Sequence, residues 1–205
     1  MEFSKIFYFL SVSIVLTLAP GPDNLFVMIQ SITQGKKAGI ATSLGLCTGV
    51  LFHTTAAALG ISAIIYKSAL MFKLVKYLGA FYLIYLAYKA YKDKNEILHP
   101  QEGEKLDSVS LYKKGVIMNI LNPKVSLFFL AFLPQFINES GRSIPLQMVF
   151  LGLVFIMQAL LIFTIICLFS EKLGEKIMHN ENIWGKIGIV KSLVFTMIGL
   201  KMAID

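Results

Sequence analysis

Long apolar runs alternate with short polar segments along the chain. Each run is long enough to cross about 30 Å of hydrocarbon as a helix. The six runs are Phe3 to Ile32, Ile40 to Tyr66, Ala69 to Tyr88, Gly115 to Ile137, Ile144 to Phe169 and Ile187 to Ile204. They are continuous and lack the period of two that the strands of a membrane barrel show. The pattern predicts an all-α integral membrane protein with six transmembrane helices.

The composition agrees with a membrane protein. Hydrophobic residues make up 56% of the chain and charged residues 15%, whereas a soluble domain has roughly 25% charged residues. We expect the first run to be retained and not cleaved as a signal peptide. Glu2 interrupts the basic start that such a peptide needs, and Pro20 directly follows the alanine that would end a cleavage site.

The net charge of +7 comes from lysines that are unevenly distributed between the two sides of the membrane. The connections between runs one and two, three and four, and five and six hold more lysines than the opposite side. Positively charged connections face the cytoplasm, so both termini are predicted to lie outside. No basic stripe with interleaved aromatic residues lies between the runs, so nucleic acid is not an expected partner.

A polar stretch over residues 92–110 separates three runs from three runs and is predicted to be a linker. It divides the chain into residues 1–91 and 111–205. When the halves are aligned, "GPDNLFVMI" at 21–29 falls on "NPKVSLFFL" at 122–130. Since each half has an odd number of runs, the second half enters the membrane from the opposite face. The sequence therefore predicts two inverted three-helix repeats.

Prolines break the first and fourth runs at matching places. A straight helix over Phe3 to Ile32 would be about 45 Å long, which is too long for the bilayer without strong tilt. Pro20, Gly21 and Pro22 are expected to end one helix and begin another, with proline at the first helical position. In the fourth run Asn122 is predicted to be an N-cap and Pro123 the first helical residue.

Both new helices then start inside the bilayer, and each carries a charge in its first turn. Asp23 lies in one and Lys124 in the other. Charges inside a membrane usually find partners or mark functional sites. One interpretation is an ion pair that holds the two broken helices together. The other is a site for a zwitterion such as an amino acid. Its carboxylate would bind Lys124 and the N–H groups after Pro123, and its ammonium would face Asp23 and Asn24.

Other polar residues in the runs have two interpretations each. His53 lies near the middle of the second run and is a candidate for carrying a coupling proton, or it is a neutral histidine bonded to a neighbouring helix. Asn119, one turn before Pro123, either contacts the substrate or bonds between helices. Gly45 and Gly49 form a GxxxG pattern that would pack within the chain or form a homodimer.

The two cysteines, Cys47 and Cys167, both lie in apolar runs and form neither a disulfide framework nor a CxxC motif. They are expected to pack in the interior. No cofactor and no metal site are predicted.

The segment "LAPGPDNLFVMIQSITQGKKAGIATSLGLCTGVLFHTTAAALGISAII", together with "GVIMNILNPKVSLFFLAFLPQFI", resembles the lysine exporter family, LysE/RhtB, of bacterial amino-acid exporters. The resemblance implies a secondary transporter, not an enzyme. It would export amino acids or their derivatives across the bacterial cytoplasmic membrane, driven by protons. The matching positions are the following: Pro20, Gly21, Pro22, Asn122, Pro123 and Lys124, with similar residues in relatives at Asp23, Asn24 and His53.

The wider superfamily leaves two further alternatives, a thiol-disulfide electron relay and a metal-ion exporter. A relay needs cysteines beside the prolines of runs one and four, where Asp23 and Lys124 stand instead. A metal exporter favours clusters of histidine or carboxylate in the linker, and that stretch contains only His99 as a histidine. A membrane scaffold that transports nothing is a third alternative, and it would tolerate the loss of both charges.

Overall fold

The computed structural model describes residues 3–19, 21–61, 69–92, 106–138 and 143–178, with a few isolated positions from 186 onward. All regular structure in these residues is helical, as the sequence predicts. The elements are α1 (Phe3–Leu18), α2 (Pro22–Gln34), α3 (Lys36–Ala56), the π-helix η1 (Ala57–Ile61), α5 (Ala69–Lys92), α6 (Ser108–Ile120), α7 (Pro123–Leu127), the π-helix η3 (Phe128–Phe132), the 3₁₀-helix η4 (Leu133–Phe136) and α8 (Ile144–Met178).

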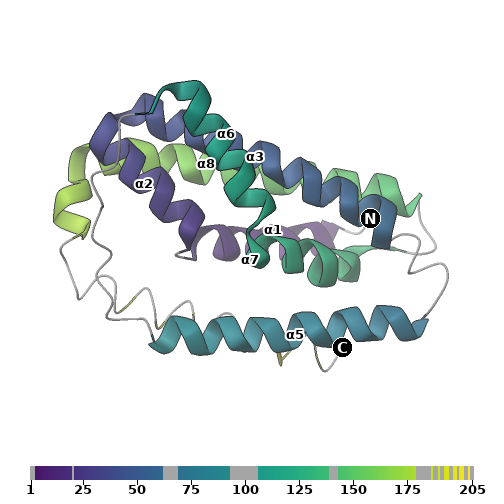
Figure 1. Cartoon of the computed structure of the whole chain (residues 1–205). Helices are drawn as coiled ribbons and strands as arrows, with labels where there is room; N and C mark the ends of the chain where they lie inside the picture. The colour runs from purple at the N-terminus through teal and green to yellow at the C-terminus, as the bar shows by residue number, and fades with distance from the viewer. Residues whose placement is uncertain are drawn as a thin grey trace.

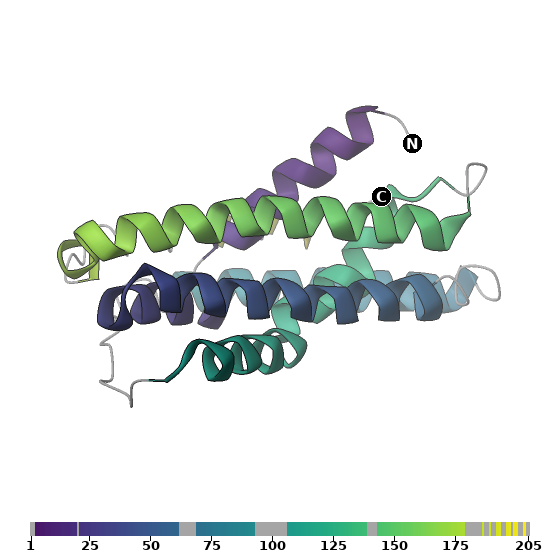
Figure 2. The same ribbon diagram turned by 90° about the horizontal axis from the view of Figure 1, so that it is seen from above.

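The helices form an elongated bundle built around α3 and α8, which lie side by side and antiparallel (Figures 1 and 2). Within the described residues, Lys36–Gly60 and Ile144–Ser170 are each long and apolar enough to cross a membrane. The count rises to four if each bent helix pair is one span. The third predicted run forms the helix α5, whereas Ile187 to Ile204 lies largely outside the described residues. The six-helix prediction is therefore confirmed only in part.

The two predicted helix breaks are present. The axes of α1 and α2 meet at 58°, and those of α6 and the helical segment Pro123–Phe136 meet at 49°. Pro22 and Pro123 begin the second helix of each pair, because proline lacks the N–H that a first-turn residue leaves unused. The two bent pairs cross the bundle in opposite directions (Figure 1). The full inverted repeat stays a prediction, and Pro20 lies outside the described residues.

Glycines bring α3 and α6 into direct backbone contact. A Cβ atom on Gly45 would lie 2.1 Å from the carbonyl oxygen of Tyr112. A Cβ atom on Gly115 would lie 2.6 Å from the carbonyl oxygen of Thr42. Of the two uses predicted for the GxxxG pattern, Gly45 and Gly49 therefore serve packing within the chain. A homodimer would have to use another surface.

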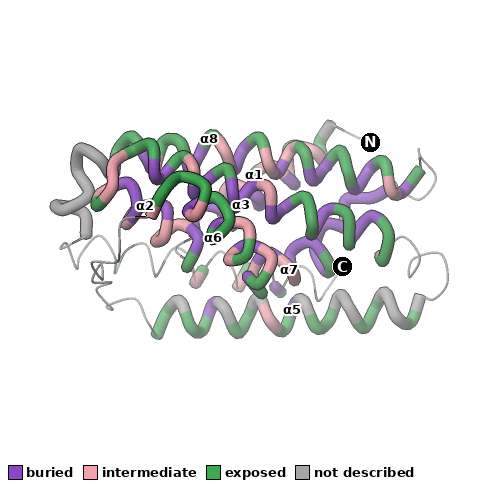
Figure 3. Tube along the Cα trace, turned by 45° about the horizontal axis from the view of Figure 1, so that its top comes forward, coloured by how far each residue is buried: buried purple, intermediate pink, exposed green. Residues whose placement is uncertain are grey.

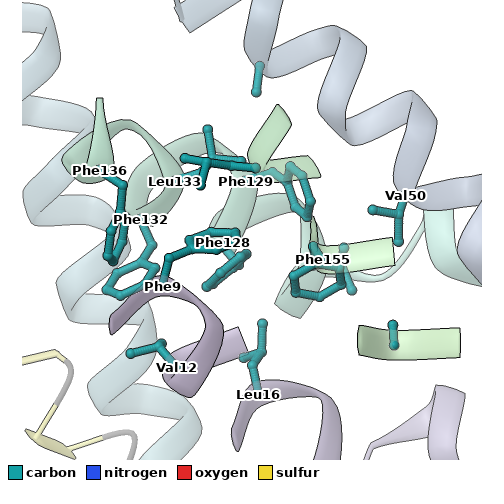
Figure 4. Packing of buried hydrophobic residues seen from close by; sticks show 14 of the residues in the cluster. Phe9, Val12, Leu16, Val50, Phe128, Phe129, Phe132, Leu133, Phe136 and Phe155 are labelled. Carbon is teal, nitrogen blue, oxygen red and sulfur yellow. The ribbon is translucent and has the colours of Figure 1, made fainter. Parts of the chain in front are cut away.

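Apolar side chains fill the interior and also cover the outside. Phe9 of α1 packs against Phe128 and Phe136 in an aromatic cluster that reaches Phe155 of α8 (Figure 4). Large hydrophobic side chains on α5 and α8 are exposed, and short exposed segments recur along both helices (Figure 3). Phe81, for example, is 73% exposed. An apolar exterior of this extent is typical of a surface that lipid covers.

The start of α6 differs from the predicted linker boundary. Ser108 to Ser110, expected in the linker, form the first turn of the helix. Asp107 is the N-cap, and its Oδ1 accepts a 2.7 Å hydrogen bond from the Ser110 N–H. Leu106 donates its backbone N–H to Oε1 of Gln34, which ties this end to α2. Asp is a good cap because its side chain satisfies a helix N–H that has no partner within the helix.

The cap predicts a pH-dependent contribution to stability. The Ser110 N–H lowers the pKa of the exposed Asp107 carboxyl. Its contribution to folding is therefore present above the unfolded pKa and is lost as the pH falls through the folded value. We expect Asp107→Ala to lower the unfolding temperature in detergent at neutral pH, with the difference shrinking in acid. Asp107→Asn is the control, because its amide caps without titrating. A deficit of the alanine variant that is unchanged in acid would contradict this role.

Candidate functional site

The two helix breaks lie against each other, and the second break supplies hydrogen bonds to Asp23 of the first. Asn119 Nδ2 donates to Asp23 Oδ2 at 3.2 Å, and Asn122 Nδ2 donates to Oδ1 at 2.9 Å. Asp23 is only 3% exposed. Carboxylate oxygens only accept, so these bonds fix which end of each amide faces Asp23. The Asn119 Oδ1 atom then points elsewhere, and it is buried without a hydrogen-bond partner.

Asn122 also caps the helix that follows it. Its Oδ1 accepts from the backbone N–H of Lys124 at 3.0 Å, as expected for an N-cap. The N–H groups of Val125 and Ser126 donate to the backbone carbonyl of Asn122 at 3.1 Å. Pro123 has no N–H. The N–H groups after Pro123, predicted to bind a substrate carboxylate, are therefore already occupied within the chain.

Lys124 reaches back to the first break. Its Nζ donates to the backbone carbonyls of Leu16 at 3.2 Å and Ala19 at 3.3 Å. These carbonyls belong to the C-terminal end of α1, where the helix dipole attracts a cation. Gly21 leaves room for this lysine, since a Cβ there would lie 3.2 Å from Nζ. Asn24 donates to the carbonyls of Thr17 and Ala19 and completes this end.

The predicted ion pair between Asp23 and Lys124 is not formed. Asp23 bonds to two amides, and Lys124 bonds to two carbonyls of α1. Both charges nevertheless face the same cavity. The two breaks meet as predicted, and of the two interpretations of the charges the direct ion pair is wrong. The physical reason is that each charge has neutral polar groups closer to it, side-chain amides for Asp23 and backbone carbonyls for Lys124.

The cavity between the breaks has a volume of about 20 Å³, which is room for about one water molecule. Its polar lining comes from Thr17, Asp23, Asn24, Asn119 and Lys124. Its apolar lining comes from Leu16, Val50, Val125, Phe155, Ala159 and Phe163. Val50 and Ala159 lie near the midpoints of the candidate spans of α3 and α8. The cavity is therefore at mid-depth in the bundle, and an amino acid enters only if the helices move apart.

His53 lies behind this site and does not line the cavity. Its Nε2 is 2.9 Å from the backbone carbonyl of Asn119. A carbonyl only accepts, so Nε2 carries a proton. The ring also lies near Phe52 and Phe129. This is the predicted bond from a neutral histidine to a neighbouring helix, and the coupling role stays a prediction.

Sequence reasoning missed part of the cavity wall. Thr17, Phe155 and Phe163 line it, and Gln158 supports Thr17 through a 2.9 Å bond from Nε2 to Oγ1. A polar residue within an apolar run is a usable signal for Thr17. A phenylalanine in such a run does not indicate a cavity, because most phenylalanines there pack in the core or face lipid.

Comparisons with known proteins agree with the predicted resemblance. Residues 14–205 match the family model of the LysE type translocator. The uncharacterized membrane protein YrhP of Bacillus subtilis (strain 168) is 32% identical over 96% of this chain and 97% of its own length. An uncharacterized membrane protein of Vibrio cholerae is 28% identical over 95% of this chain and 94% of its own length.

A relative with a named activity is the homoserine/homoserine lactone efflux protein of Salmonella typhimurium. It is 29% identical over 80% of this chain and 79% of its own length. No solved structure matches the chain. The family model covers nearly the whole sequence and both helix breaks, so the chain belongs to the LysE type translocator family, whose members are membrane transporters and not enzymes.

Proposed function

We propose that this chain is a secondary transporter that exports small amino acids or their derivatives across the bacterial cytoplasmic membrane. One observation carries the proposal. Two helix breaks meet at mid-depth, and a buried Asp23 carboxylate and the Lys124 ammonium face the same small cavity. Broken helices that meet at the bilayer midplane are a common plan for transporter binding sites. The efflux protein of Salmonella typhimurium supports an amino-acid-like substrate.

In this proposal the substrate lies between the two breaks. Its ammonium faces Asp23, with Asn24, Asn119 and Asn122 shaping that end, and a carboxylate, where the substrate has one, faces Lys124. The apolar wall formed by Phe155, Phe163 and Val125 receives the side chain. No covalent bond is made or broken. The protein binds the substrate, opens the site to the other side of the membrane and releases the substrate there.

The small cavity implies that the bent helix pairs move during transport. A volume of about 20 Å³ is too small for an amino acid. Alternating access by movement of one repeat against the other would open it to each side in turn. The contacts of Lys124 with α1 are then among those that have to break.

Proton coupling is proposed through His53 and the asparagine it contacts. His53 bonds to Asn119, and Asn119 bonds to Asp23. A second proton on the His53 imidazole would thus affect the Asp23 carboxylate through Asn119, which contacts both residues. Histidine suits this role because its ordinary pKa lies close to physiological pH.

The lysines support an orientation in the membrane. The start of α3, the end of α5 and the start of α6 lie at the same end of the bundle (Figure 1). These segments carry Lys36, Lys37, Lys89, Lys92, Lys113 and Lys114. By the positive-inside rule we propose that this end faces the cytoplasm and that both termini face outward.

The test compares cells that lack the protein with cells that overproduce it. Both are loaded with dipeptides, and each amino acid reaching the medium is timed. We expect overproduction to accelerate the release of at least one small amino acid and a protonophore to abolish the acceleration. If no amino acid leaves faster and toxic analogues are no better tolerated, the exporter proposal is rejected.

A further inference from the structure

We infer that the substrate leaves the cavity toward the outer face along a polar seam between α1 and α8, formed by Ser13, Thr17 and Gln158. The seam is a transient second site for the substrate ammonium after it separates from Asp23. This inference rests on the proposed function and names the route of release from the same cavity.

The seam begins at the wall of the cavity. Thr17 lines the cavity, and its Oγ1 accepts a 2.9 Å hydrogen bond from Nε2 of Gln158, which joins α1 to α8. Ser13 precedes Thr17 by four residues on α1, so the two side chains lie on the same face of the helix about one turn apart. Because both termini are proposed to face outward, Ser13 lies on the outward side of Thr17.

The seam holds two buried polar atoms that have no hydrogen-bond partner among the described residues, Oγ of Ser13 and Oε1 of Gln158. The two residues are 0% and 7% exposed. A helical serine commonly donates to the carbonyl four residues earlier, as Ser11 and Ser31 do, and Ser13 lacks even this local bond. Buried polar groups without partners are unfavourable. An ammonium group supplies N–H donors to both atoms, because each can accept.

An aromatic cluster fills the other side of α1 between the cavity and this end of the bundle. Phe155 lines the cavity, and its ring centroid lies 5.4 Å from that of Phe128. Phe128 in turn contacts Phe9 and Phe132, and Phe136 contacts the same two rings (Figure 4). A charged substrate that crossed these rings would give up its hydrogen bonds without replacement. The polar seam offers such a substrate hydrogen-bonding groups instead.

The test measures efflux by the purified full-length chain in proteoliposomes, with alanine, threonine and homoserine as probes and protein-free liposomes as the blank. We expect Ser13→Ala to slow the rate at saturating substrate by about fivefold, because one hydrogen bond on the release path is lost. The apparent KM should not rise, because the cavity itself is unchanged. The unfolding temperature should rise, because an unpaired buried hydroxyl has been removed. A purely structural residue would not combine slower transport with higher stability.

A second variant and a matched control accompany Ser13→Ala. Gln158→Met keeps the length of the side chain and removes both ends of the amide, so it should slow transport by about tenfold without raising the apparent KM. Ser31→Ala is the control. Ser31 is also a buried helical serine, but its hydroxyl donates to the carbonyl of Val27 at 2.7 Å. Its alanine variant should transport at the wild-type rate and should not gain stability.

The outcomes separate this inference from the proposed function. If the wild-type chain carries none of the three amino acids, the proposed function fails and the inference fails with it. If the wild type carries an amino acid and both seam variants carry it equally fast, the route lies elsewhere and the exporter proposal stands. A higher KM in the seam variants would place these residues in the binding step. A slower Ser13→Ala with a lowered unfolding temperature would assign Ser13 to packing. Either of the last two results also overturns the inference.

Discussion

Asp23→Asn is expected to lower transport by about 10- to 100-fold while the protein still folds. A hydrogen bond to a charged group contributes about 1.5 to 3 kcal/mol, and each 1.4 kcal/mol is about tenfold. The variant keeps the shape of the side chain but loses the charge that would face the substrate ammonium. It also offers one acceptor to the two donating amides of Asn119 and Asn122, so one amide loses its partner.

Asp107→Asn is the matched control for this variant. It makes the same chemical change on an exposed helix cap outside the cavity, so transport should stay at the wild-type rate. Initial rates in proteoliposomes, normalised to the amount of folded protein, provide the comparison. Wild-type transport by Asp23→Asn would show that the carboxylate does not take part, and the site between the helix breaks would have to be abandoned.

The helix breaks could be predicted from the sequence because their cause is local. Proline without an N–H, glycine before it and asparagine as a cap each act on their own turn. Pro22 and Pro123 therefore begin helices where expected. The same local signals were enough to place Asp23 and Lys124 in the first turns of the two helices. Their common cavity then follows from how the two bent pairs pack.

The partners of Lys124 could not be predicted, because they are backbone atoms. The Leu16 and Ala19 carbonyls that bind Lys124 exist whatever side chains those positions carry. An ion pair was one of two interpretations of the opposite charges, and hydrogen bonds to neutral amide and carbonyl groups are formed in its place. The start of α6 at Ser108 was missed for another reason. Asp107 is a good cap signal, but it lies within a stretch whose mixed charge suggested a linker.

The contacts of Lys124 suggest how substrate binding and opening are connected. In this structure Lys124 joins α7 to the end of α1, and Asn24 donates to one of the same two carbonyls, that of Ala19. A movement that separates the two breaks must expose those carbonyls unless another donor replaces Lys124. The packing of the two breaks against each other is therefore stabilised by residues that also line the cavity.

Gly49→Ala is expected to weaken substrate binding by about tenfold, although Gly49 does not line the cavity. A Cβ atom at this position would lie 2.6 Å from Cβ and 2.8 Å from Oδ1 of Asn119. Contacts this short force α6 to shift or the Asn119 side chain to rotate. Either movement disturbs the 3.2 Å bond to Asp23. Overpacking of a close interface also destabilises a protein by about 1 to 3 kcal/mol, so the unfolding temperature should fall as well.

Two glycine variants separate the effect on the site from the effect on stability. Gly60→Ala should change neither, because no atom lies within 4 Å of its Cβ position. Gly45→Ala meets the Tyr112 carbonyl at 2.1 Å, so it should destabilise the same interface at least as much. Its clash is with α6 backbone about two turns before Asn119, so the folded fraction should lose less substrate affinity than that of Gly49→Ala. If Gly45→Ala and Gly49→Ala change the apparent KM equally, Gly49 has only a packing role and does not position Asn119.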